Sequence, residues 1–364
     1  MRKQLLYIAI FILGVVACEE VYTPKLDNVD SFLVVEAIFI SGEEQHTIYL
    51  YETAGFFDES SNYSPVSGAS IFLVDKYQKP FAFKETESGT YQINHALNEA
   101  EQYSLYIELN GEVYESAVQS VPEKPVLDTV YGEYTSKVTT EGTANSADNI
   151  VTSYGIQLYT DMKDNGTLNH YRFYGRKIIQ YFDYYDTLLP GASEPEKWPI
   201  YGWDSYSPEG SFNIAGPPKY SSVKSITRHS LEFFNQDYYK FIADTQSFAG
   251  WIYIIYQYGI NEDTYNYYED LNNQLEAEGK IFDPVYVEAE GNISCTSNPK
   301  INVLGNFEIS SFNEKRYFLY YRRNFSGIDT IKNIPYFYNI PLHGYIKNDM
   351  PDFWERRSKS YPDE

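Results

Sequence analysis

The feature that most constrains the fold is a series of short stretches between residues 32 and 118 in which apolar and polar residues alternate. Tyr103–Leu109 alternates cleanly and is followed by Asn110-Gly111, the strongest short hairpin signal in the chain. Alternation with a period of two indicates a strand that buries one face. About six such stretches, separated by turn residues, predict a β-sandwich of immunoglobulin-like or transthyretin-like kind over residues 31–125.

The remaining residues, 126–364, predict a larger, aromatic-rich, mainly-β domain with one or two helices. The chain holds 38 tyrosines and 22 phenylalanines, and both residue types favour strands. We expect long strands at residues 154–161 and 170–181, joined as a hairpin by Asp164-Asn165-Gly166. A helix is expected between Asn261 and Gly279, because its apolar residues recur with helical spacing.

Two segments of this second region are expected to be irregular. Residues 136–149 are small and polar, and residues 190–220 contain six prolines and four glycines. The second segment carries Trp198, Tyr201 and Trp203, and aromatic side chains on a loop can anchor a protein interface or stack on sugars. The alternative is that the loop folds back and buries both tryptophans against the second domain.

The N-terminus is typical of a secretory signal. Residues 1–17 have a basic start and an apolar run from Leu5 to Val16. A membrane-spanning helix would need about twenty apolar residues, and Glu19 ends this run too early. Cys18 directly follows Val-Val-Ala, which resembles a bacterial lipobox whose cysteine receives lipid before cleavage. The alternative is an ordinary signal peptide with a chance cysteine. Residues 18–30 are then the tether.

Charge and motifs restrict the possible functions. The chain has 51 acidic and 28 basic residues, a net charge of −23, so we expect no nucleic-acid partner. The five histidines lack zinc-site spacing, and no P-loop, G-x-S-x-G or dinucleotide fingerprint occurs. We therefore expect no metal, no cofactor and no enzymatic activity. Cys295 is expected to be a packed small side chain.

Several segments, in order and spacing, resemble a Bacteroidota outer-membrane lipoprotein family described as domain of unknown function 4249. They accompany the lipobox and are Phe32–Glu36, Pro65–Ala69, Gly89–Tyr91, Ile281–Pro284, Gly291–Ser294 and Val303–Gly305. Many members end in cysteine-bearing segments, whereas this chain has no cysteine after Cys295. The family has no assigned catalytic residues, so none are transferred to this chain.

The resemblance implies an outer-membrane lipoprotein, often encoded beside a TonB-dependent transporter. We expect it to be anchored through Cys18, to face the cell surface, and to dock on such a transporter or another outer-membrane β-barrel complex. The alternative is a ligand-capture module that delivers a glycan or peptide to the transporter, with the segment from Trp198 to Trp203 as its platform.

Overall fold

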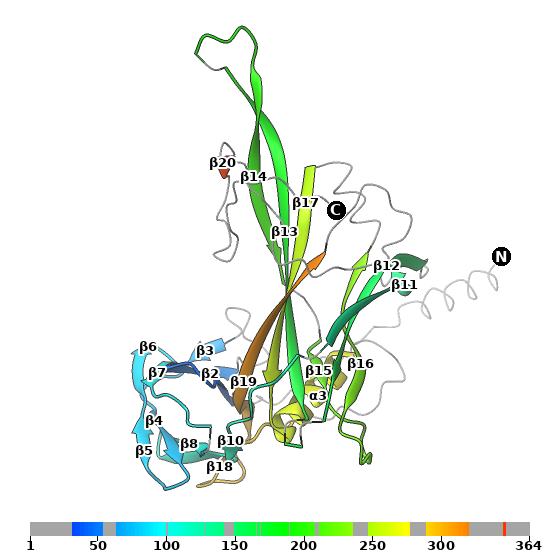
Figure 1. Cartoon of the computed structure of the whole chain (residues 1–364). Coiled ribbons are helices and arrows are strands. Elements are labelled where there is room, and N and C mark those ends of the chain that lie inside the picture. The colour runs from blue at the N-terminus through cyan, green and yellow to red at the C-terminus, as the bar shows by residue number, and fades with distance from the viewer. Residues whose placement is uncertain are drawn as a thin grey trace, which may run out of the picture.

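The computed structural model describes residues 31–53, 63–99, 101–127, 129–141, 149–164, 166–167, 169–188, 190–207, 211–235, 247–276, 289–319 and 345–346. The predicted signal peptide (1–17) and tether (18–30) lie outside the described residues. The described part is mainly β, as predicted, with strands in three sheets and α3 as its one helix (Figure 1).

The first ten strands lie in two sheets that pack face to face. They are β1 (Leu33–Ile40), β2 (Gln45–Thr53), β3 (Tyr63–Pro65), β4 (Ser70–Asp75), β5 (Pro80–Ala82), β6 (Lys84–Glu87), β7 (Thr90–Asn94), β8 (Gln102–Leu109), β9 (Glu112–Ser116) and β10 (Gln119–Ser120). One sheet holds β1, β2, β3, β6 and β7, and the other holds β4, β5, β8, β9 and β10. The predicted sandwich-type fold is confirmed.

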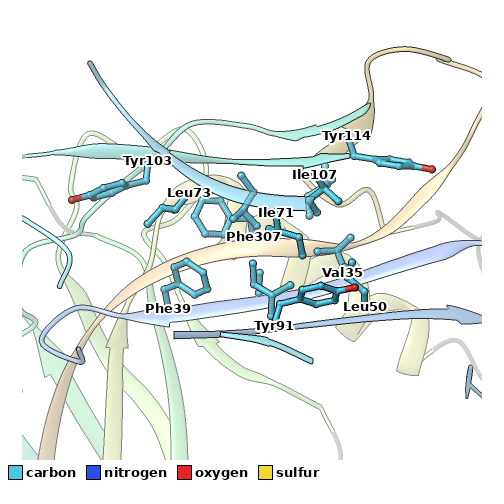
Figure 2. Packing of buried hydrophobic residues seen from close by; sticks show 14 of the residues in the cluster. Val35, Phe39, Leu50, Ile71, Leu73, Tyr91, Tyr103, Ile107, Tyr114 and Phe307 are labelled. Carbon is cyan, nitrogen blue, oxygen red and sulfur yellow. The ribbon is translucent and has the colours of Figure 1, made fainter. Parts of the chain in front are cut away.

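The core of the sandwich consists of alternate residues from both inner faces. Figure 2 shows Phe39 and Leu50 from one sheet facing Leu73 and Ile107 from the other, and all four are fully or almost fully buried. Burying a side chain of this size contributes roughly 1.5–3 kcal/mol, so these alternating positions stabilise the packing of the two sheets.

The β8–β9 hairpin turns at Asn110 and Gly111, as the sequence predicted. Their φ angles are +52° and +86°, the left-handed values that a two-residue type I′ turn requires. Asparagine and glycine are the residues that adopt this conformation at least cost. The turn therefore follows from local chemistry alone.

Two strands from far along the chain complete the sandwich. β18 (Ile293–Cys295) pairs with β9, and β19 (Val303–Leu319) pairs in parallel with β1. Cys295 is buried, which confirms its predicted packing role. Gly305 has φ +99°, and a Cβ there would lie 2.0 Å from the Val35 carbonyl oxygen, so the pairing requires glycine. The domain boundary at residue 125 stays a prediction. The structure shows in addition that β18 and β19, which come from beyond that residue, take part in the sandwich.

The second region extends the sheet beyond β19. Its elements are β11 (Thr129–Glu141), β12 (Asn149–Met162), β13 (Tyr171–Thr187), β14 (Glu196–Tyr206), β15 (Asn213–Ala215), β16 (Ile226–Asn235), β17 (Ser247–Gly259), α3 (Glu262–Glu276) and β20 (Tyr345–Ile346). The large sheet runs in the order β20-β14-β13-β17-β19-β1-β2-β7-β6. In Figure 1 the β13–β14 ribbon extends far from the sandwich.

A separate three-stranded sheet, β11-β12-β16, packs on the large sheet. Leu158 and Phe234 from the small sheet share a buried cluster with Phe173 and Ile255 of the large one. This second core lies beside α3, which follows β17 after a two-residue connection.

The prediction that residues 190–220 are irregular is wrong for two parts of that segment, β14 and the short strand β15. Residues Glu196–Tyr206 form β14, which pairs with β13 along its whole length despite Pro199. Among the described residues, β14 has only the two-residue β20 on its other side, and prolines are tolerated near sheet edges. The long partner strand therefore overrides the local breaker signal.

Two further local predictions need correction. The expected loop at 136–149 belongs to strands β11 and β12 except for residues 142–148, which lie outside the described residues. The expected hairpin at Asp164-Asn165-Gly166 does not form, because β12 pairs with β11 and β16 whereas β13 pairs with β14, β15 and β17. A turn signal predicts a change of direction but not the strand that becomes the neighbour.

His46 makes the sandwich core sensitive to pH. Its ring is 2% exposed and stacks on Phe39 with the ring centroids 4.6 Å apart. Burial lowers the pKa of His46 to about 4. Because folding favours the neutral ring, its contribution to stability is complete above about pH 6.5 and is lost as the pH falls towards 4. We expect this residue to account for a loss of about 3 kcal/mol in the free energy of unfolding.

Urea unfolding of the wild type and His46→Phe between pH 7 and pH 4 measures this effect. The variant should lose stability less steeply on acidification, because phenylalanine cannot take up a proton. Ile107→Val is the control, since it weakens the same core from the opposite sheet and should keep the wild-type pH dependence. The same acid loss in His46→Phe and in the wild type would contradict the assignment.

Candidate functional site

A buried ion pair joins the two halves of the large sheet. Arg172 Nη2 on β13 donates to Glu308 Oε1 on β19 at 2.7 Å, and their side chains are 14% and 1% exposed. Tyr268 Oη on α3 donates to Glu308 Oε2, also at 2.7 Å. Both carboxylate oxygens of Glu308 are therefore hydrogen-bonded, one from the sheet and one from the helix.

The Arg172 guanidinium also packs over two aromatic rings. It lies 4.4 Å from the ring centroid of Tyr258 and 5.2 Å from that of Tyr268. Burial opposes the charge on Arg172, but the Glu308 carboxylate together with Tyr268 and Tyr258 outweighs burial and raises the pKa of Arg172. Burial raises the pKa of Tyr268 well above its ordinary value, and Glu308 adds to this shift. At neutral pH the Arg172 guanidinium is therefore charged and the Tyr268 phenol is neutral.

This cluster positions α3 over the outer face of β1 and β19, where a groove opens. The groove has a volume of about 780 Å³. Alternation in β1 directs Val35 and Phe39 into the sandwich and leaves Glu36 and Ile38 on the groove side. The helix contributes a wall of apolar and aromatic residues that includes Tyr267, Tyr268 and Leu271.

The floor of the groove contains an unusual polar residue. Asn306 on β19 is 8% exposed, and its Oδ1 and Nδ2 atoms are buried without a hydrogen-bond partner. Its strand neighbour in register is Glu36, which is exposed at the groove. Burial raises the pKa of the nearby phenols Tyr51 and Tyr267, and the Glu36 carboxylate adds to both shifts. The arrangement combines an unsatisfied amide, a carboxylate and two phenols.

A second, polar cavity of about 1220 Å³ lies at the start of α3. His170 on its wall packs against Tyr265 with ring centroids 5.0 Å apart, and burial lowers the pKa of His170. Lys219 on the rim is paired with Glu269 at 2.8 Å. In the described residues, no group of three or more His, Cys, Asp or Glu side chains is placed to hold a metal ion.

The third feature is an exposed apolar face on the β11–β12 hairpin. Direct register pairs place Tyr134, Val138, Ile150 and Tyr154 on the same face as the buried Ile156. Ile156 lies in the second core, whereas the other four side chains lie beyond it and are 53–76% exposed. Within the described residues β11 pairs only with β12, so its second edge is open.

Of the four predicted site residues, Trp203 is the one whose side chain the structure describes. Cys18 lies outside the described residues. Trp198 and Tyr201 belong to β14, but nothing of their side chains is described, so their binding role stays a prediction. Trp203 is 6% exposed, so its ring does not form an open platform. The alternative prediction is that both tryptophans are buried, and Trp203 is buried.

Sequence reasoning missed Arg172, Glu308 and Asn306. Glu308 and Asn306 alternate with the apolar Phe307 and Ile309, which is the pattern of a strand with one solvated face. Nothing local indicates that a helix 40 residues earlier in the sequence covers that face. A polar residue on such a strand is ordinarily read as exposed, and only the contact with α3 identifies these as buried.

The model of the family described as domain of unknown function (DUF4249) matches residues 19–316. The chain belongs to this family. The match covers the sandwich strands, α3 and the groove of this DUF4249 protein. No curated protein matches the chain. In the part of the DUF4249 chain that the structure describes, no helix is both long and apolar enough to cross a bilayer.

Replacing Arg172 by methionine tests the buried cluster. The change leaves the Glu308 carboxylate buried without its cation, so we expect a loss of about 3–5 kcal/mol in the free energy of unfolding. Chemical denaturation measures the loss.

Arg228→Met is the matched control because Arg228 pairs with Glu133 at the surface, with side chains 55% and 40% exposed. We expect that change to cost less than about 1 kcal/mol. Equal effects of the two substitutions would show that the buried pair does not hold the elements together.

Proposed function

We propose that this DUF4249 protein is a non-enzymatic outer-membrane lipoprotein, anchored through Cys18, that docks on an outer-membrane β-barrel complex. A TonB-dependent transporter is the barrel we favour. The observation that carries the proposal is the exposed apolar face of the β11–β12 hairpin, formed by Tyr134, Val138, Ile150 and Tyr154. Contiguous exposed apolar side chains on a soluble protein mark interaction surfaces.

The geometry of this hairpin suits a protein partner. Its apolar residues continue the face that is buried against the second core, so a partner that covers them would extend that core. β11 is 13 residues long, and its second edge, which no other described strand covers, presents backbone groups that could bind another strand. The net charge of −23 supports a protein partner over nucleic acid or an anionic lipid surface.

Lipid attachment would confine the protein to the membrane surface, where it would meet its barrel partner by diffusion in the plane of the membrane. Lipidation at Cys18 with more than one acyl chain gives stable anchoring. The tether of residues 19–30 spans at most about 40 Å when extended, which keeps the sandwich near the bilayer. We propose that the protein faces the cell surface, and protease treatment of intact cells tests this orientation: protection of the chain would place it on the inner side.

Cys18→Ser tests the anchor. We expect the variant to leave the membrane fraction and to lose labelling by a clickable palmitate analogue, because the thioether to diacylglycerol cannot form. Cys295→Ser is the control, since that thiol is buried and should carry no lipid. A Cys18→Ser protein that stays in the membrane with undiminished label would contradict lipidation.

The docking surface is tested by a double substitution, Val138→Glu with Ile150→Glu. These side chains are 62% and 76% exposed, so the folded chain should tolerate the change, while an apolar interface would not. We expect at least a tenfold loss of the barrel protein that co-purifies from detergent-solubilised outer membranes.

The matched control is Val118→Glu with Val126→Glu, two valines that are equally exposed elsewhere on the chain. The control should retain the partner at the wild-type level. A wild-type protein that emerges from the membrane alone, or an equal loss in both double variants, argues against docking through this hairpin.

A further inference from the structure

We propose that the groove between α3 and strands β1 and β19 binds a short peptide segment that carries a basic side chain. The site is separate from the β11–β12 hairpin and does not rest on the proposed docking. Its walls are apolar and aromatic, its floor holds Asn306, and Glu36 lies at its edge. Its volume of about 780 Å³ is in the range of pockets that hold small ligands.

The first observation is the unsatisfied amide of Asn306. Burying a polar group without a partner costs about 1–3 kcal/mol, so native proteins rarely leave one in this state. Here both the donor and the acceptor of one side chain are unpartnered. A peptide group offers the complementary acceptor and donor side by side. A ligand that supplies the missing hydrogen-bond partners would remove the free-energy cost of burying this amide.

The second observation is the difference between the two acidic residues of the groove. Glu308 is neutralised by Arg172 and accepts a further hydrogen bond from Tyr268, so it has no charge left to offer a ligand. Glu36 is exposed, and no described cationic side chain forms an ion pair with it. A groove with one uncompensated carboxylate favours a cation.

The third observation is the type of wall around that carboxylate. Tyr51 and Tyr267 lie near Glu36, and aromatic faces attract ammonium and guanidinium groups. Ile38 and Leu271 supply apolar surface for the methylene stem of a basic side chain or for a neighbouring apolar residue. The cation would then be bound by its charge and its stem together.

The mode of binding follows from the sheet. β1 is paired on both sides, with β2 and β19, so a ligand cannot join the sheet there as an additional strand. It must lie across the outward-facing side chains and beneath α3. A neutral glycan would satisfy Asn306 but leave the Glu36 charge uncompensated, which is why the groove favours a basic peptide.

Calorimetric titration of the purified full-length protein in detergent tests the inference. The probe is N-acetyl-Leu-Lys-Leu-amide, with N-acetyl-Leu-Glu-Leu-amide and maltotetraose as matched alternatives. We expect binding of the lysine peptide that is at least tenfold tighter than that of the glutamate peptide. Absence of lysine-peptide binding at millimolar concentration, equal affinity for both peptides, or preferential binding of maltotetraose would overturn the proposal.

Two substitutions locate the binding. Glu36→Gln should weaken the lysine peptide about tenfold, whereas Glu115→Gln, an exposed acid on the opposite sheet, should not. Asn306→Leu should also weaken binding at least tenfold, yet it should not lower the midpoint of thermal unfolding, because it removes an unsatisfied amide.

If Asn306 had only a structural role, Asn306→Leu would lower the midpoint of thermal unfolding and leave the affinity for the lysine peptide unchanged. Glu36→Gln keeps the test valid if Asn306→Leu fails to fold, because Glu36 is exposed. The Val138→Glu, Ile150→Glu protein must bind the lysine peptide like the wild type, so that failure of docking and failure of peptide binding are distinguished.

Discussion

The arrangement of this protein depends on one buried interaction, the ion pair between Arg172 and Glu308 with its hydrogen bond from Tyr268. A carboxylate that is 1% exposed is stable only with its cation and its hydrogen bonds in place. Three elements, β13, β19 and α3, each contribute one partner. The cluster therefore fixes the position of the helix above the sheet, and the groove beneath the helix has its shape because that position is fixed.

The long strand β19 transmits this constraint to the rest of the molecule. Its first half pairs with β1 and buries Phe307 in the sandwich, and its second half pairs with β17. One face of the strand thus belongs to the sandwich core, while the other presents Asn306 and Glu308 to the helix. A change in the register of β19 by one residue would exchange these two faces. Both the core and the groove would then be lost.

The two proposed interactions use different surfaces and different kinds of contact. The β11–β12 hairpin offers apolar area and an open edge, which suits a large protein partner. The groove offers a charge, an unsatisfied amide and aromatic walls, which suits a small segment of a ligand. A protein that docks with one surface keeps the other available. Under the proposed function, an anchored chain would in this way hold a peptide beside its barrel partner.

The sequence by itself determined the features that depend on neighbouring residues. Alternation predicted the sandwich strands, and Asn110-Gly111 predicted the turn with its positive φ angles. The tertiary structure alone decided the features that depend on distant partners. β14 forms despite Pro199 because β13 lies beside it, and Asn306 is buried because α3 covers its strand. Local patterns report which face a strand can bury, whereas burial itself depends on the element that packs there.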